Sequence, residues 1–339
     1  MPTFNHAAYV GEAIDSALAQ TFHAWELVVI DDGSTDGTLD VIRQYRDPRI
    51  RLIAREYRGL TGLGAAYRSV LDQSSAPLVA ILEGDDRWPA DKLQRQVADF
   101  DDPQVVLSFG AGWLIDACGC EYGRVTPFTP KVRTNQPVGA IVPSLLSVNP
   151  ILSPTVVVRR ASLESVGGFW QPDGVPYVDH PTWLLLAMEG TFAYHDTPVG
   201  SWRRHPAQWT TRVVEDLTEP PEAAYIDLIA DRSAIAVGHR SGPIRSHQQL
   251  HSTHADRAMT NRWRLALLGG TNREVARMAL TLVRSGRPRL AGIALVGLAM
   301  WAVGSDLEWL QLRRGRVGWP SRRHVHARPC PDQSPSLDT

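Results

Sequence analysis

The first hundred residues alternate short apolar runs with helical patterns, and this alternation constrains the fold more than any other feature. The apolar runs occupy 26–30, 50–54 and 77–82, and helical spacing occupies 12–18, 39–45, 64–73 and 91–100. Strand–helix units with short connections build a parallel sheet that helices cover on both faces. The sequence therefore predicts an α/β fold with a doubly wound, mostly parallel sheet.

Acidic residues follow two of these predicted strands. Asp31-Asp32-Gly33-Ser34 comes after the first apolar run, and Glu83-Gly84-Asp85-Asp86 comes after the third. Open α/β sheets bind their ligands at the carboxyl ends of the strands. Crowded carboxylates repel each other, so the second cluster makes most sense with a divalent cation between it and a phosphate. The alternatives are a solvated acidic turn for the second cluster and an Asp-Gly turn capping a helix for the first.

Composition excludes several classes of protein. The formal net charge of −1 gives no reason to expect nucleic acid as a partner. The three cysteines, Cys118, Cys120 and Cys330, cannot form a disulfide framework, and we interpret them as reduced thiols of a cytoplasmic protein. We expect no transmembrane segment, because the longest apolar run, 290–303, is shorter than the roughly 20 residues that span a bilayer.

The pattern of apolar residues changes along the chain and divides it into three regions. We expect an α/β domain over 1–215 and a helical extension over 216–318, with helices over 223–237, 246–268 and 272–285. Within the first region, we interpret the Pro- and Asn-rich stretch 131–150 as a loop. The last residues, 319–339, are poor in apolar residues and are predicted to be disordered.

Several motifs in order along residues 1–210 resemble the family 2 glycosyltransferases, whose nucleotide-sugar-binding fold is called GT-A. The matching segments are Pro2-Thr3-Phe4-Asn5-His6, Ser16 to Phe22, Glu26 to Asp36, Leu82 to Trp88, and Lys92-Leu93. The family normally has an apolar strand before the first of these segments. Here Met1 abuts the turn, and we interpret this as a start placed too late or a protein that works without that strand.

The resemblance implies a nucleotide-sugar donor and a metal ion. Pro2, Phe4, Asp31, Asp32 and Glu83 would bind the nucleotide, with Phe4 against the base and Asp32 hydrogen-bonded to it. Asp85 occupies the place of the second acid of the family's Asp-x-Asp motif, and would bind Mg²⁺ or Mn²⁺ that bridges the diphosphate.

The resemblance also implies a catalytic base and an inverting reaction. Asp179 takes the place of an acidic residue that activates the acceptor hydroxyl, although Val178 replaces the Glu that usually precedes it. A plain helix cap is the alternative role, and the two roles can coexist. Arg203 or His205 would contact the diphosphate or the metal, with a solvated basic loop as the alternative. The segment Asn149 to Thr155 also matches the family, and the sequence assigns it no role.

The expected activity is transfer of one sugar to a saccharide or lipid-linked acceptor, in cell-envelope, polysaccharide or glycolipid synthesis. A nucleotide-sugar-binding module with impaired catalysis is the alternative, since the first strand and the Glu before Asp179 are both missing. Arginines on both sides of the 290–303 run suggest peripheral membrane contact through 287–316, at the inner face of the cell membrane. A helix buried against the catalytic domain is an equally open interpretation of that run.

Overall fold

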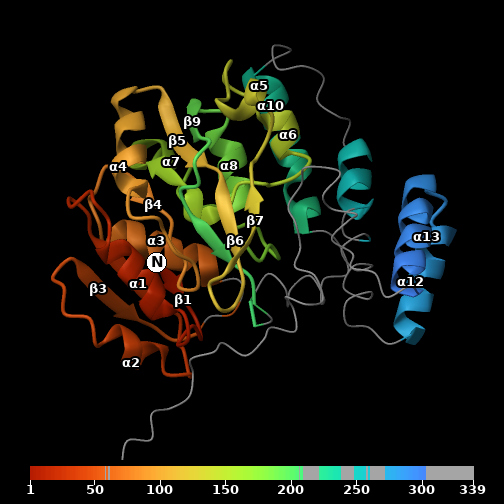
Figure 1. Ribbon diagram of the computed structural model, residues 1–339. Helices are drawn as coiled ribbons and strands as arrows, with labels where there is room; N and C mark the ends of the chain where they lie inside the picture. The colour runs from red at the N-terminus through yellow and green to blue at the C-terminus, as the bar shows by residue number, and fades with distance from the viewer. Residues whose placement is uncertain are drawn as a thin grey trace, which may run out of the picture. The chain divides into compact units, whose positions relative to one another are not determined.

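The computed structural model describes residues 1–57, 59, 62–205, 207–208, 221–237, 248–256, 259 and 272–302 (Figure 1). The chain divides into two compact units. The first contains Met1–Trp113, Val125–Trp202 and Glu219–His254, and the second contains the described parts of Leu114–Arg124, Arg203–Thr218 and Ala255–Thr339. The predicted disordered end, 319–339, lies outside the described residues.

A parallel sheet forms the start of the first unit. Its order is β1 (Pro2–Thr3), β2 (Leu27–Asp31) and β3 (Ile50–Ala54), and both neighbouring pairs are parallel. All five residues of β2 are buried, as a central strand covered on two faces requires, and this explains its continuous apolar run. The sequence predicts that the first strand of the resembled family is missing, and the structure has a two-residue β1 that pairs with β2.

Helices cover this sheet on both faces. They are α1 (Val10–Leu18), α2 (Thr38–Ile42) and α3 (Leu63–Asp72). The buried side chains of α1 are spaced three or four residues apart and share one core cluster with Leu27 and Val29 of β2. Tyr67 and Leu71 of α3 belong to a different cluster, although α3 also contacts β2. The predicted α/β architecture is confirmed here.

The second sheet of this unit mixes parallel and antiparallel strands. Its order is β4 (Leu78–Ala80), β8 (Val157–Arg159), β5 (Val105–Gly110) and β9 (Thr191–His195). β5 and β9 are parallel, whereas β8 runs antiparallel to both β4 and β5. The prediction that the strand over 77–82 pairs in a parallel sheet is therefore wrong for its β8 partner. The turn that follows this strand reaches the parallel sheet, because Gly84 N donates to Pro2 O at 3.1 Å.

Several helices pack around the second sheet. They are α4 (Lys92–Val97), α5 (Pro130–Arg133), α6 (Val142–Leu145), α7 (Arg160–Ser165), α8 (Asp179–Leu186) and α10 (Ile226–Val237). Short 3₁₀ helices span Ala98–Asp101, Ser153–Thr155 and Pro221–Ala224, and residues 248–256 are also helical. The expected loop over 131–150 is wrong at α5 and at α6, and in α6 Val142 and Leu145 are buried in the largest core cluster.

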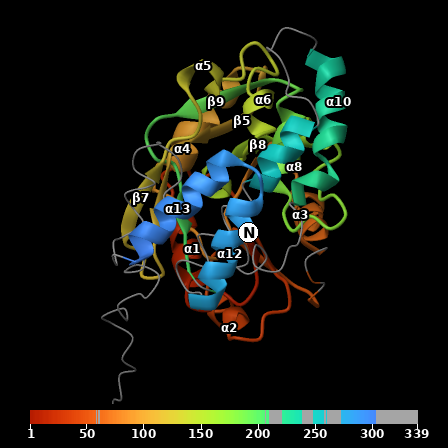
Figure 2. The ribbon, with the colours of Figure 1, turned by 90° about the vertical axis from the view of Figure 1, so that its right-hand side faces the viewer.

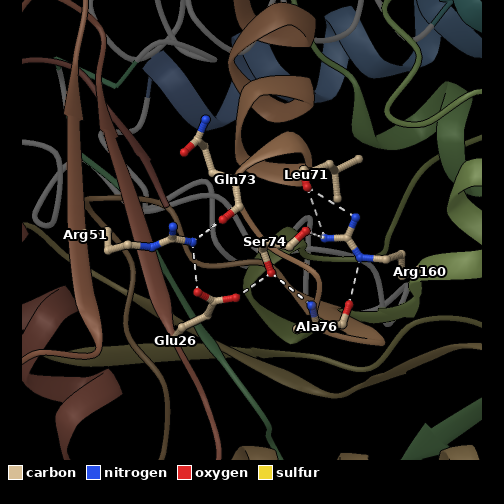
Figure 3. A network of polar contacts seen from close by, with 7 residues as sticks. All are labelled: Glu26, Arg51, Leu71, Gln73, Ser74, Ala76 and Arg160. Carbon is tan, nitrogen blue, oxygen red and sulfur yellow. Dashed lines mark hydrogen bonds and ion pairs between the residues drawn. The ribbon is translucent and has the colours of Figure 1, made fainter.

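A network of polar contacts ties the end of α3 to its neighbours (Figure 3). The guanidinium of Arg160 donates to the carbonyl of Leu71 near the end of α3 and to those of Ser74 and Ala76 in the loop that follows. Glu26 accepts hydrogen bonds from Arg51 and from the Ser74 hydroxyl. These contacts anchor β2, β3 and α3 at the edge of the sheet opposite to its acidic ends.

A third sheet has three strands in the order β10–β6–β7. These strands are β6 (Gly112–Ile115), β7 (Glu121–Val125) and β10 (Ser201–Arg203). The turn between β6 and β7 contains Cys118 and Cys120. Cys120 is free and exposed, and Cys330 lies outside the described residues.

The helices α12 (Asn272–Arg284) and α13 (Pro288–Ala302) lie side by side in the second unit (Figures 1 and 2). They share a small core of Val275, Ala279, Leu282, Leu290 and Ala294. Among the described residues, no helix combines the length and apolar character needed to cross a bilayer. Of the predicted membrane-contacting segment 287–316, residues beyond 302 lie outside the described residues.

Candidate active site

Both acidic turns of the sequence lie beside the first strand. Asp32 N donates to Thr3 O at 2.9 Å, and Gly84 N donates to Pro2 O at 3.1 Å. The segment Pro2–Thr3 therefore lies between the two turns, which are some fifty residues apart in the chain. The structure brings these carboxylates to one edge of the sheet, where open α/β folds bind their ligands.

Gly84 permits this close approach. A Cβ atom at this position would lie 2.4 Å from Thr3 Oγ1 and 2.8 Å from His6 Nδ1. Only glycine fits there without movement of its neighbours. A glycine at position 84 thus lets the turn that contains Glu83 and Asp85 pack directly against the first strand.

The second acidic turn concentrates negative charge. One oxygen each from Glu83, Asp85 and Asp86 lies within 4.8 Å of the others. Burial, and then the charges of Asp85 and Asp179, raise the pKa of Glu83 to about 8. His6 Nε2 lies 3.8 Å from Asp85 Oδ2, and Tyr67 Oη donates to Glu83 Oε1 at 3.2 Å. Hard oxygen donors at this spacing, with charge that a cation would stabilise, fit a Mg²⁺ or Mn²⁺ ion.

The first acidic turn has its charge compensated by the protein. Asp32 forms an ion pair with Arg55, with Nε–Oδ1 at 2.8 Å, and Arg55 also donates to Gly62 O. Asp31 is fully buried, and its Oδ2 accepts from Ser34 N at 3.1 Å. Asp31 therefore builds the turn, while the Asp32–Arg55 pair lies closer to solvent. The predicted nucleotide contacts of both residues stay predictions.

An aromatic pair lies next to this turn. The rings of Phe4 and Tyr57 stack with centroids 4.5 Å apart and planes inclined by 14°, and Tyr57 is 49% exposed. Sequence reasoning named Phe4 but missed Tyr57 and Arg55. A signal was available, because parallel pairing of Asp31 with Ala54 brings the residues after β3 beside the first acidic turn.

Asp179 is the first residue of α8. Asn149 Nδ2 donates to Asp179 Oδ2 at 2.8 Å. Burial raises the pKa of Asp179 to about 6, although hydrogen bonds from the His180 backbone and from Asn149 oppose the rise. The charge of Asp179 contributes to the raised pKa of Glu83, so α8 brings Asp179 to the same region as the acidic cluster. The N-cap residue of α8 is Val178, without a side-chain cap hydrogen bond, and the role of Asp179 as a base stays a prediction.

The predicted basic residues belong to the second unit. Arg203 is buried, and its Nη1 donates to the carbonyls of Asp116 and Ala117, each at 3.3 Å, in the turn between β6 and β7. His205 is also buried. The contact of either residue with a diphosphate or a metal stays a prediction.

Comparisons with known proteins agree with this arrangement. A family model described as Glycosyl transferase family 2 matches residues 1–165. TuaG of Bacillus subtilis, a glycosyltransferase with a proposed role in teichuronic acid biosynthesis, is 30% identical over 195 residues, which are 57% of this chain and 72% of TuaG.

Two further similarities concern a named activity and the fold. WfgD of Escherichia coli, named as a UDP-Glc:alpha-D-GlcNAc-diphosphoundecaprenol beta-1,3-glucosyltransferase, is 37% identical over 98 residues, 29% of this chain and 38% of WfgD. The crystal structure of S. aureus TarS 1–349 in complex with UDP-GlcNAc superposes with a TM-score of 0.53 at 18% identity, covering 86% of this chain and 82% of that one. At that identity, the likeness to TarS shows a shared fold.

Proposed function

This chain belongs to glycosyl transferase family 2, and we propose that it moves one sugar from a nucleotide-diphosphate donor to an acceptor hydroxyl with inversion of configuration. The observation that carries this proposal is the junction at Pro2–Thr3, where the two acidic turns meet. At such a junction, the first acidic turn can bind a nucleotide and the second can bind a metal-bound diphosphate.

The donor is a nucleotide sugar held across this junction. The Phe4–Tyr57 pair offers an aromatic surface for a base, and the Asp32–Arg55 pair offers hydrogen-bonding groups for its edge or for the ribose. UDP-sugars are the first donors to test, since WfgD is named for UDP-Glc and TarS was solved with UDP-GlcNAc.

The carboxylates of the second turn would hold the cation. Asp85 would be the principal ligand, and Glu83 and Asp86 lie close enough to share the ion or its water. When bound, a divalent cation supplies positive charge that stabilises the departing diphosphate. Gly84 keeps this cluster against the first strand, where the diphosphate would follow from the nucleotide.

Asp179 acts as the base. Its carboxylate takes the proton of the acceptor hydroxyl, whose oxygen then attacks the anomeric carbon from the face opposite the diphosphate. This attack forms the new glycosidic bond as the sugar–phosphate bond breaks, and it inverts the anomeric configuration. A base with a pKa of about 6 is ionised at neutral pH and still basic enough to accept a proton.

The acceptor is a saccharide, free or lipid-linked, and the setting is synthesis of a cell-envelope polysaccharide. The names of TuaG and WfgD support this class of acceptor. Peripheral membrane contact through 287–316 would bring the enzyme to a lipid-linked acceptor at the inner face of the membrane. Leu280, Val283 and Leu295 of α12 and α13 are 53%, 46% and 62% exposed, and Arg284 and Arg289 are exposed beside them.

Sedimentation with liposomes tests the membrane contact. Vesicles with anionic lipid should pellet the protein at low salt, and Leu280→Ser with Leu295→Ser should weaken the pelleting. Retention of the protein in the supernatant with such vesicles would reject the contact and leave the transfer reaction untouched.

Asp179→Asn tests the reaction against its alternative, a module that binds the donor without catalysis. We expect transfer to fall by about 10²–10⁴-fold, because a general base contributes that much, while Mn²⁺-dependent donor binding remains. A thermal-shift screen of UDP-, GDP- and dTDP-sugars with and without Mn²⁺ measures the binding. Equal transfer by the wild type and Asp179→Asn would remove the proposed base.

A further inference from the structure

The segment that begins at Asn149 has no role in the reaction described so far. It joins α6 to the 3₁₀ helix Ser153–Thr155, and it matched the family in the sequence without an assigned purpose. In the structure, its first residue reaches the catalytic carboxylate: Asn149 Nδ2 donates to Asp179 Oδ2 at 2.8 Å.

The orientation of the Asn149 amide is determined by a second hydrogen bond. Ile151 N donates to Asn149 Oδ1 at 3.1 Å. A backbone N–H can only donate, so Oδ1 is the acceptor and the Nδ2 group is the one that points to Asp179. The amide therefore cannot flip without losing both contacts.

We propose that Asn149 is a positioning residue, which holds one oxygen of the Asp179 carboxylate so that the other faces the acceptor hydroxyl. This inference rests on the proposed role of Asp179 as the base. A hydrogen bond donated to Oδ2 favours the ionised form and limits rotation of the carboxylate. Asn149 thus keeps a carboxylate ionised in a place that otherwise favours its protonation.

The groups around Asp179 show why such a donor matters. The charge of Glu222 raises the pKa of Asp179, and the charge of Asp179 in turn raises the pKa of Glu83. The phenols of Tyr67, Tyr177 and Tyr225 are also within electrostatic reach, and their pKa values lie above the ordinary value, so they stay neutral. His180 Nε2 bonds to Leu145 O and its Nδ1 bonds to Tyr225 Oη. Asn149 is the side chain in this set that donates directly to the Asp179 carboxylate.

Two substitutions separate positioning from a structural role. Asn149→Ala removes both hydrogen bonds. Asn149→Asp keeps the Oδ1 acceptor for Ile151 N but presents an oxygen, in place of the donor, to Asp179. If Asn149 only shapes its loop, Asn149→Asp should behave like the wild type; if it positions the base, Asn149→Asp should be worse than Asn149→Ala.

The protonation of Asp179 can be measured by chemical labelling, without a transfer assay. Carbodiimide and an amine label protonated carboxyls, and peptide mass spectrometry gives the labelling rate of Asp179 against pH. We expect Asn149→Ala to label about fivefold faster than the wild type at pH 7, since a hydrogen bond to a charged group is lost, and Asn149→Asp faster still. Ser165→Ala, on the exposed side of α7, is the control and should label at the wild-type rate.

The kinetic readout is the acidic limb of kcat/KM against pH. Both Asn149 variants should shift this limb to higher pH and lower kcat more than they raise the donor KM, with Asn149→Asp more severely affected. Wild-type labelling and pH profiles in both variants would overturn the proposal. A labelling shift in a protein that shows no transfer would uphold the contact and reject the proposed function, so the two failures are distinguishable.

Discussion

The two acidic turns beside the first strand look alike in sequence, yet the protein treats their charges differently. At the first turn, Asp32 is paired with Arg55 and Asp31 accepts a backbone N–H, so the carboxylates are stabilised by the chain itself. At the second turn, burial and neighbouring carboxylates push the pKa of Glu83 to about 8. The carboxylates of the first turn have an ion pair and a backbone hydrogen bond within the chain, whereas the second turn favours the arrival of a cation.

This difference indicates which turn would bind the nucleoside of the donor and which would bind its diphosphate. A turn whose charge is already compensated can offer hydrogen bonds to a nucleoside without attracting metal. A turn whose carboxylates repel each other gains most from a cation, which a diphosphate then completes. Four substitutions test these roles, and each changes a residue of one of the two turns.

The largest effect is expected from Asp85→Asn at the second turn. Loss of the principal metal ligand should slow transfer by about 100-fold or more and remove the Mn²⁺ dependence of donor binding. The measurement is kcat/KM and donor affinity against Mn²⁺ concentration. Asp101→Asn, an exposed position with the same change of charge, is the control. A wild-type Mn²⁺ response in Asp85→Asn would place the metal elsewhere.

Gly84→Ala should disturb the same turn through its packing. The added Cβ would meet Thr3 Oγ1 at 2.4 Å, so the turn must move, at a cost of about 1–3 kcal/mol in the free energy of unfolding. The free energy of unfolding, measured with urea, and the affinity for Mn²⁺ should both fall. Gly292→Ala on α13 is a matched control, since its Cβ meets no atom within 4 Å and alanine favours a helix. Equal losses in both variants would contradict this account.

Asp32→Asn tests the first turn. It leaves Arg55 without its carboxylate partner and should weaken nucleotide binding by about tenfold, the effect of losing a charge-assisted hydrogen bond. Because this turn is not the metal site, Mn²⁺ dependence should persist, as isothermal titration with the nucleotide can show. Loss of the Mn²⁺ response here would mean that the two turns do not divide their roles.

The smallest effect concerns pH and the metal-free protein. The native state holds a proton on Glu83 above the ordinary pKa of 4.5, so stability should fall as pH rises from there to about 8. Glu83→Gln imitates the protonated form and should be more stable than the wild type at pH 8 by about 1 kcal/mol in the presence of a chelator, allowing for partial solvent screening. Chemical unfolding at pH 5 and pH 8 measures this. An equal change in the free energy of unfolding between pH 5 and pH 8 in the two proteins would show that the pKa of Glu83 is not raised in the folded state.

Much of the fold was predictable because it depends on local patterns. The run at 26–30 gave a buried central strand, and the strand over 50–54 has the predicted bounds. The antiparallel β8 was harder to foresee, because its pairing with β4 joins segments some eighty residues apart. The same limit explains α6, since burial of Val142 and Leu145 depends on a core contributed by distant elements.

The candidate site divides in the same way. The positions of Asp31, Asp32, Glu83 and Asp85 follow from strand ends, which a sequence pattern indicates. Arg55, Tyr57, Tyr67 and Asn149 join them only through parallel pairing and through packing of separate helices and loops. Their side chains are ordinary in sequence, and nothing local marks them as partners of the acidic residues.

The sequence by itself determined that this chain has an α/β sheet with carboxylates at two strand ends and an acidic residue at a later helix start. Those features are short-range, since they depend on apolar periodicity and on the residues that follow each run. The tertiary structure alone decided which carboxylates are compensated and which are crowded. Charge balance in a protein depends on which groups come within a few ångströms in space, and parallel strands with long connections bring together residues far apart in sequence.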